Sequence, residues 1–171
     1  MTVRQAVRAT GTAWVAFGWV VAFLAAHVYW YAGGQLGRAG DLPPLVPGSV
    51  GGWVFEIGVV AAFPVGAAAC LAVARARGVP RRIAAVVVWT GAVVLAVRGG
   101  AGLVDDLLRA GGAAGGLTGM SIADVTGTAR PSAAELWSGR ATDAYFTVGA
   151  LLFALLGFRC RTPQPTRATP P

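Results

Sequence analysis

The sequence contains few charged residues and few of the side chains on which most enzymes depend. Only 12% of its 171 residues are charged, it has one histidine and two cysteines, and all 14 basic residues are arginines. A hydrophobic content of 56% and a mean hydropathy of +0.64 exclude an ordinary soluble domain. The composition therefore predicts an integral membrane protein.

Sequence motifs of several catalytic classes are also absent. There is no G-x-x-x-x-G-K-[ST] phosphate loop, no H-E-x-x-H and no G-x-S-x-G. Cys70 and Cys160 are ninety residues apart, which disfavours a disulfide-exchange enzyme, and we interpret both as small apolar residues near helix ends. A single histidine without clustered carboxylates or thiols disfavours a metal site, and we expect no cofactor.

The basic charge of the chain raises the question of nucleic-acid binding. The net charge is +7 and the isoelectric point is near 11. The arginines, however, stand at the ends of apolar runs and do not form one stripe with interleaved aromatics. We therefore expect the lipid bilayer as a partner and no nucleic acid.

Four apolar runs are long enough to cross a hydrocarbon core of about 30 Å. They predict an all-α, four-helix membrane bundle with spans at about 11–34, 51–74, 83–104 and 141–158. The remaining segments are a cytoplasmic N-terminus at 1–10, an outer loop at 105–140 and a disordered cytoplasmic tail at 159–171. The first run could be mistaken for a signal peptide, but its length and the interfacial Trp30 favour an uncleaved span.

The distribution of arginines predicts the sidedness of the spans. With four spans, nine arginines fall inside, namely Arg4, Arg8, Arg75, Arg77, Arg81, Arg82, Arg159, Arg161 and Arg167. Four fall outside, where acidic residues offset them: Arg38, Arg109, Arg130 and Arg140. The positive-inside rule then places both termini in the cytoplasm, and we expect a multi-pass protein of the plasma membrane.

The outer loop at 105–140 is glycine-rich at first and then resembles the start of a helix. Ser132 and Glu135 have capping-box spacing directly after Pro131. This pattern predicts a short helix that carries Trp137 at the membrane surface. A connection of this length is usually either functional or disordered, and the sequence leaves both options open.

Four ionisable residues lie within or beside the spans at similar estimated depths. If the first span enters the membrane near Thr12 and the third near Ile83, His27 and Arg98 each lie fifteen residues, or about 22 Å of helix rise, from the inner boundary. Glu56 is near the outer start of the second span, and Asp143 begins the fourth. A charge at the membrane centre costs about 2.5–3.5 kcal/mol on insertion scales, so such side chains generally face a bundle interior.

We therefore expect a polar cluster in an outward-facing pocket. Its candidate residues are His27, Glu56, Arg98 and Asp143, edged by Trp30, Trp53 and Tyr145. Pairing of Arg98 with Glu56 would lessen the cost of burying either, and the imidazole could carry a proton near neutral pH. In the alternative interpretation, Arg98 and Glu56 only lock helices together while His27 reaches the headgroups.

The segment from His27 to Gly34 resembles the opening motif of a known protein family. It reads His-Val-Tyr-Trp-Tyr-Ala-Gly-Gly and is similar to the aromatic-Trp-x-x-Gly-Gly end of the first helix in small four-span bacterial membrane proteins, a domain of unknown function. Arg98-Gly99-Gly100, Leu136-Trp137 and Asp143-Ala144-Tyr145-Phe146 with Gly149 and Phe153 resemble later parts of the same family. Many relatives have tyrosine where Arg98 stands. The resemblance implies an architecture and no activity.

These observations predict a non-enzymatic membrane protein. We expect either an accessory subunit of a membrane partner protein or a protein that binds a lipid or lipophilic small molecule in the outer pocket. One alternative is a membrane enzyme that performs proton-transfer chemistry with His27 and Glu56 as acid and base. Another is a small proton-coupled exporter in which Glu56 titrates. The sequence does not identify the ligand.

Overall fold

The computed structural model describes residues 3–34, 50–75, 80–123 and 128–161 as an all-α fold. The long helices are α1 (Val3–Tyr31), α2 (Val50–Arg75), α3 (Arg81–Ala110) and α5 (Ala133–Arg161), and the described residues contain no strand. Each helix includes a stretch that is long and apolar enough to cross a membrane. The predicted four long helices are confirmed.

Three of the helices extend beyond the predicted spans. α1 begins at Val3, before position 11; α3 continues past 104 to Ala110; and α5 begins at Ala133, before position 141. The connection predicted at 105–140 therefore shortens to 111–132. The third span was predicted to end before Asp105 and Asp106, but charged residues at a helix end that form ion pairs do not interrupt the helix.

The short helix predicted after Pro131 is the first part of α5. The backbone N–H of Glu135 donates a hydrogen bond to Ser132 Oγ over 3.2 Å, and the N–H of Ser132 donates to Glu135 Oε2 over 2.5 Å. These two bonds form the predicted capping box, which satisfies backbone donors at the start of the helix. Trp137 lies in the second turn of α5 and is exposed.

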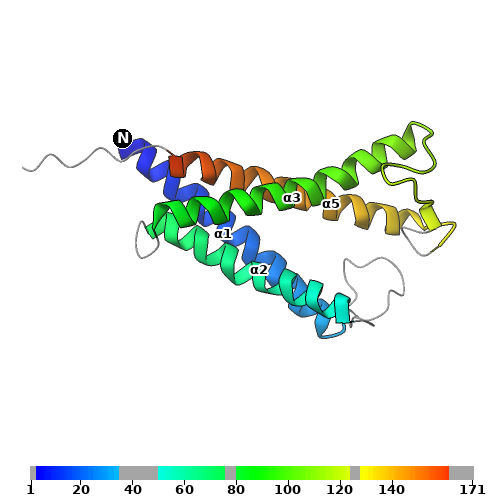
Figure 1. The fold of residues 1–171 in the computed structure, drawn as a ribbon, viewed down its shortest axis with the longest axis horizontal. Helices are drawn as coiled ribbons and strands as arrows, with labels where there is room; N and C mark the ends of the chain where they lie inside the picture. Colours follow the sequence, from blue (N-terminus) through cyan, green and yellow to red (C-terminus); the bar gives the residue numbers. More distant parts are fainter. Residues whose placement is uncertain (1–2, 35–49, 76–79, 124–127, 162–171) are drawn as a thin grey trace, which may run out of the picture.

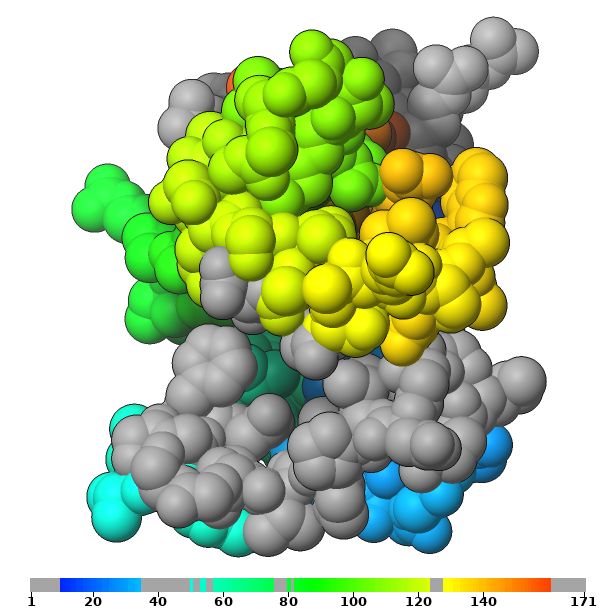
Figure 2. Space-filling model, turned by 90° about the vertical axis from the view of Figure 1, so that its right-hand side faces the viewer, coloured from blue at the N-terminus to red at the C-terminus, as the bar shows by residue number. Residues whose placement is uncertain are grey.

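The four helices form two hairpins arranged as a V (Figure 1). α1 packs against α2, and α3 packs closely against α5. The hairpins touch through the pairs α1–α5 and α2–α3 and separate toward one end. Figure 2 looks at this open end, where the end of α3 and the start of α5 lie above the end of α1 and the start of α2. We call the space between the diverging hairpins the inter-hairpin space.

Glycines allow α3 and α5 to approach closely. A methyl group on Gly99 would stand 2.6 Å from the backbone oxygen of Asp143, and one on Gly91 would stand 2.9 Å from the Phe153 ring. Gly102 faces the Asp143 carboxylate in the same way. Small residues in apolar helices commonly allow such a close approach.

The core lies where the two hairpins cross. Its buried residues include Ala13, Ala16, Cys70, Val88 and Leu156, which are contributed by all four helices. Cys70 is fully buried, and neither cysteine forms a disulfide. The closed end of the V therefore contains the packed core, and the helices separate toward the open end.

Candidate functional site

An aromatic cluster closes the base of the inter-hairpin space, with Phe23 of α1 at its centre. The Phe23 ring contacts six neighbouring rings at centroid distances of 4.6–6.2 Å. These are Trp19, His27, Trp30, Phe63, Tyr145 and Phe146. Because they come from α1, α2 and α5, the cluster joins the two hairpins.

Tyr145 fixes α5 to α1 at this level. Its ring stacks on Trp19 with a centroid distance of 4.7 Å, and its hydroxyl donates a 2.6 Å hydrogen bond to the Trp19 backbone oxygen. The Trp19 indole in turn lies over Gly149 of α5, where any larger residue would collide with it. Ring stacking and a buried hydrogen bond together define where the helices stop touching and begin to diverge.

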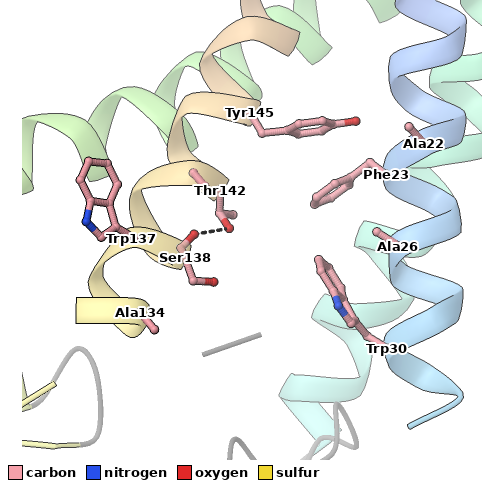
Figure 3. Close-up of a pocket in the computed structure, with 10 residues that line it drawn as sticks. Ala22, Phe23, Ala26, Trp30, Ala134, Trp137, Ser138, Thr142 and Tyr145 are labelled. Carbon is pink, nitrogen blue, oxygen red and sulfur yellow. Dashed lines mark hydrogen bonds between the residues drawn. The ribbon is translucent and has the colours of Figure 1, made fainter. Parts of the chain in front are cut away.

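Beyond Tyr145, α1 and α5 separate and leave a cleft of about 500 Å³. This volume is within the range of small-molecule sites. α1 contributes Ala22, Phe23, Ala26 and Trp30; α5 contributes Ala134, Trp137, Ser138, Ala141, Thr142 and Tyr145. Figure 3 shows Phe23 and Trp30 extending from α1 and Tyr145 extending from α5 into the space between the helices. We call this the α1–α5 cleft.

Arg98 pairs with Asp143 across the α3–α5 hairpin. Arg98 Nη1 contacts Asp143 Oδ1, and the guanidinium carbon lies 5.2 Å from the centroid of the Phe146 ring. The Arg98 side chain is 57% exposed, whereas that of Asp143 is 13% exposed. The sequence analysis placed both residues in one larger cluster and expected Glu56 as the partner of Arg98. The Glu56 side chain lies outside the described part of the chain, so that pair stays a prediction.

His27 lies on the α1–α2 side of the aromatic cluster. Its ring is half-buried, with centroids 4.6 Å from Phe23, 5.3 Å from Trp30 and 5.0 Å from Phe63. The Arg98–Asp143 pair belongs to the other hairpin, and Phe146 and Phe23 pack between the hairpins. The structure thus divides the predicted polar cluster into an aromatic surrounding for His27 and a separate ion pair.

The aromatic residues predicted at the edge of the pocket have different positions. Trp30 and Tyr145 line the α1–α5 cleft, as a pocket edge requires. Trp53 lies near the start of α2, is 47% exposed and does not line the cleft. The observed cleft is therefore largely aromatic and apolar, and none of the described residues that line it is charged at neutral pH.

Two further ion pairs stabilise the outer end of the α3–α5 hairpin. Arg140 Nε donates to Asp106 Oδ2 over 2.8 Å, and the Arg140 guanidinium lies 5.3 Å from the Trp137 ring centroid. Asp105 accepts hydrogen bonds from Arg109 Nε on the same helix over 2.6 Å. Such pairs explain why helical structure continues through charged residues at this end.

The same Arg109 holds the connection that follows α3. Its guanidinium donates to the backbone oxygens of Ala114 and Met120 over 2.8 and 3.0 Å, and Asp105 accepts from the backbone N–H of Leu117. Gly116 has a positive φ of 55° beside the Asp105 carboxylate, a conformation and a space that favour glycine. The sequence left order and disorder open for this loop, and its residues 111–120 are folded against α3.

Sequence reasoning missed the hydroxyl groups of the cleft and the central role of Phe23. Thr142 Oγ1 donates to the Ser138 backbone oxygen over 2.9 Å, and both residues line the cleft. The sequence does contain a pattern that indicates the role of Phe23. Trp19, Phe23, His27 and Trp30 recur at intervals of four, four and three residues, so they share one face of the helix. On α5, the matching signal is the small and hydroxyl-bearing series Ala134, Ser138, Ala141 and Thr142.

Comparison with known proteins gives no family assignment. The chain matches no protein-family model, no curated protein and no solved structure. The family resemblance of the His27–Gly34 segment therefore stays a prediction. Within the described ranges, no group of three or more His, Cys, Asp or Glu side chains could hold a metal ion. The α1–α5 cleft is the feature from which a function can be argued.

Proposed function

We propose that the chain is a multi-pass protein of the plasma membrane with both termini in the cytoplasm. Four helices of sufficient length and hydropathy support insertion. The arginines on both sides of the α2–α3 connection and at the end of α5 support this orientation under the positive-inside rule. In this orientation the V opens toward the outer side of the membrane.

We further propose that the α1–α5 cleft binds a lipophilic molecule of the outer leaflet. The observation that carries this proposal is an apolar, aromatic-lined cleft of about 500 Å³ between two helices that are themselves able to span the membrane. On the predicted spans, the inner part of the cleft at Phe23 and Tyr145 lies within the membrane and its outer part at Trp137 lies at the membrane surface, so a lipid chain or a lipophilic small molecule is its most accessible occupant. A helix of a membrane partner protein is the competing occupant and would make the chain an accessory subunit.

The surroundings of His27 favour binding over proton-transfer chemistry. The imidazole is half-buried among Phe23, Trp30 and Phe63 and does not line the α1–α5 cleft. A catalytic acid or base must come within hydrogen-bonding reach of its substrate. The enzyme and exporter alternatives would therefore need a second ligand position on the α1–α2 side.

Photocrosslinking in nanodiscs tests the proposed binding. A diazirine-bearing long-chain alkyl methyl ether is incorporated at increasing mole fraction, and labelled peptides are identified by mass spectrometry. We expect saturable labelling within residues 22–30 and 134–145, because a bound probe occupies a limited number of sites. Contact with bulk lipid should instead increase linearly with the probe.

Cleft-filling substitutions provide the control. Ala26→Trp and Ala141→Trp place an indole in the cleft, and each should reduce the saturable labelling to the linear background. Val28→Trp and Leu151→Trp add the same group at exposed positions outside the cleft lining and should preserve it. Labelling that never saturates in the wild type, or that saturates equally in all four variants, would contradict the proposed binding site.

A further inference from the structure

Two hydroxyl groups in the lining of the α1–α5 cleft have protons that are committed to backbone oxygens. Tyr145 Oη donates its proton to the Trp19 backbone oxygen over 2.6 Å. Thr142 Oγ1 donates its proton to the Ser138 backbone oxygen over 2.9 Å. A hydroxyl has one proton and two acceptor lone pairs, so what these two groups can offer a ligand is an acceptor.

The aromatic rings of the lining also favour a ligand that carries a hydrogen-bond donor. The faces of aromatic rings carry negative charge density and attract hydrogen-bond donors and cations. Phe23, Trp30 and Tyr145 therefore add to the acceptor character of the cleft. Donors are also present among the described lining residues, namely the indole N–H groups of Trp30 and Trp137 and the hydroxyl of Ser138, which can donate or accept.

Among the described residues that line the cleft, none is a cation that could pair with an anionic ligand. The nearest arginines on the two helices of the neighbouring hairpin already have carboxylate partners, since Arg98 pairs with Asp143 and Arg140 with Asp106. Neither arginine lines the cleft. An anionic headgroup placed between α1 and α5 would lose hydration without gaining an opposite charge, which is unfavourable.

We infer that the ligand of the α1–α5 cleft has an apolar body and a hydrogen-bond donor as its polar group, either a hydroxyl or an ammonium. This inference rests on the proposed binding function and specifies its ligand class. Lipid tails are as apolar as the cleft, so transfer from the bilayer provides little hydrophobic free energy. Selection among lipophilic molecules then depends on the donor that meets Thr142 or Tyr145.

Competition among probes with one chain and different polar groups tests this inference. The full-length protein in nanodiscs carries the photoactivatable ether, and 1-dodecanol, dodecylammonium, dodecyl methyl ether or dodecyl sulfate is added as competitor at equal mole fraction in the bilayer. We expect dodecanol or dodecylammonium to compete about 3–10-fold better than the ether, as one added hydrogen bond predicts. Dodecyl sulfate should compete most weakly.

Isosteric substitutions show whether the two hydroxyls cause the preference. Thr142→Val and Tyr145→Phe remove the acceptors and should together reduce the advantage of dodecanol over the ether to less than about twofold. Thr147→Val is the matched control, because Thr147 Oγ1 makes the same bond to a backbone oxygen four residues earlier but lies outside the cleft lining. It should leave the preference unchanged.

The outcomes separate this inference from the proposed function. Saturable crosslinking combined with equal competition by dodecanol and the ether, or with strongest competition by dodecyl sulfate, would overturn the ligand class and leave the binding site intact. Persistence of the dodecanol preference in the Thr142→Val/Tyr145→Phe double variant would overturn it as well. Failure of the proposed function would appear earlier, as the absence of saturable crosslinking by the ether itself.

Discussion

The two members of the Arg98–Asp143 ion pair are unequally exposed, so their replacement should have unequal effects. Arg98 is 57% exposed, and its long side chain can reach polar surroundings if Asp143 is lost. Asp143 is short and 13% exposed, so loss of Arg98 leaves a largely buried carboxylate without its ion-pair partner. We expect Arg98→Met to lower the free energy of unfolding by about 1.5–3 kcal/mol and Asp143→Asn by about 0.5–1.5 kcal/mol.

Reversible unfolding in mixed micelles provides the measurement for this pair. Arg130→Met is the control, since the exposed Arg130 should tolerate the change within about 0.5 kcal/mol. Replacing both partners together by apolar residues should recover most of the stability, because no unpaired charge remains. If Arg98→Met and Asp143→Asn lower the free energy of unfolding equally, the difference in exposure between the two side chains does not determine how much stability each substitution removes.

At the same scale, the sequence predicted the members of the site better than their grouping. Trp30 and Tyr145 line the cleft, and Arg98 lies beside Asp143 as expected. His27 has the expected distance along its helix but faces α2. Counting residues estimates the depth of a side chain, whereas its direction around the helix axis has to be read from contrasts in polarity. Helices that are apolar on every side provide little of that contrast.

At the scale of the elements, two adjacent glycines of α3 have different environments. A methyl group on Gly99 would stand 2.6 and 2.7 Å from the backbone oxygen of Asp143 and the backbone nitrogen of Thr147. Nothing lies within 4 Å of the same position on Gly100. Because backbone atoms cannot move aside as a side chain can, Gly99→Ala should force α3 and α5 apart.

The expected effects of the two substitutions have opposite signs. Gly99→Ala should destabilise the protein by about 1–3 kcal/mol, as overpacking commonly does. Gly100→Ala should be neutral or stabilise the helix by up to about 1 kcal/mol, because alanine has the higher helix propensity. Thermal unfolding of the two variants under identical detergent conditions compares them directly. A Gly99→Ala protein as stable as Gly100→Ala would show that the α3–α5 contact is looser than described.

Helix existence could be predicted from the sequence, but helix partners could not. Hydropathy identified all four long helices, and the Ser132–Glu135 capping box identified the start of α5. The division into two hairpins did not follow, because residues that face lipid and residues that face another helix are equally apolar. The full length of α3 and α5 was missed because their terminal charges are paired: Asp105 pairs with Arg109 within α3, and Asp106 of α3 pairs with Arg140 of α5.

For the whole molecule, the proposed orientation predicts opposite locations for the two ends of α3. A reporter fused after Arg82 should be cytoplasmic, and one fused after Ala114 should be on the outer side of the membrane. The measurement is paired activity of a cytoplasmic and an extracytoplasmic reporter at each site. Fusion within the exposed end of α5 at Ala133 serves as a second outer position. The same sidedness at Arg82 and Ala114 would exclude a span between them.

The Arg98–Asp143 pair also has a consequence for the order in which the protein is made. Its two members are separated by 45 positions, so at about 5–20 residues per second a ribosome makes Asp143 roughly 2–9 seconds after Arg98. On the proposed topology, α3 therefore enters the membrane with an uncompensated arginine and an uncovered glycine face. Arg98 and the glycine face of α3 remain without their partners until α5 has been synthesised and packs against α3.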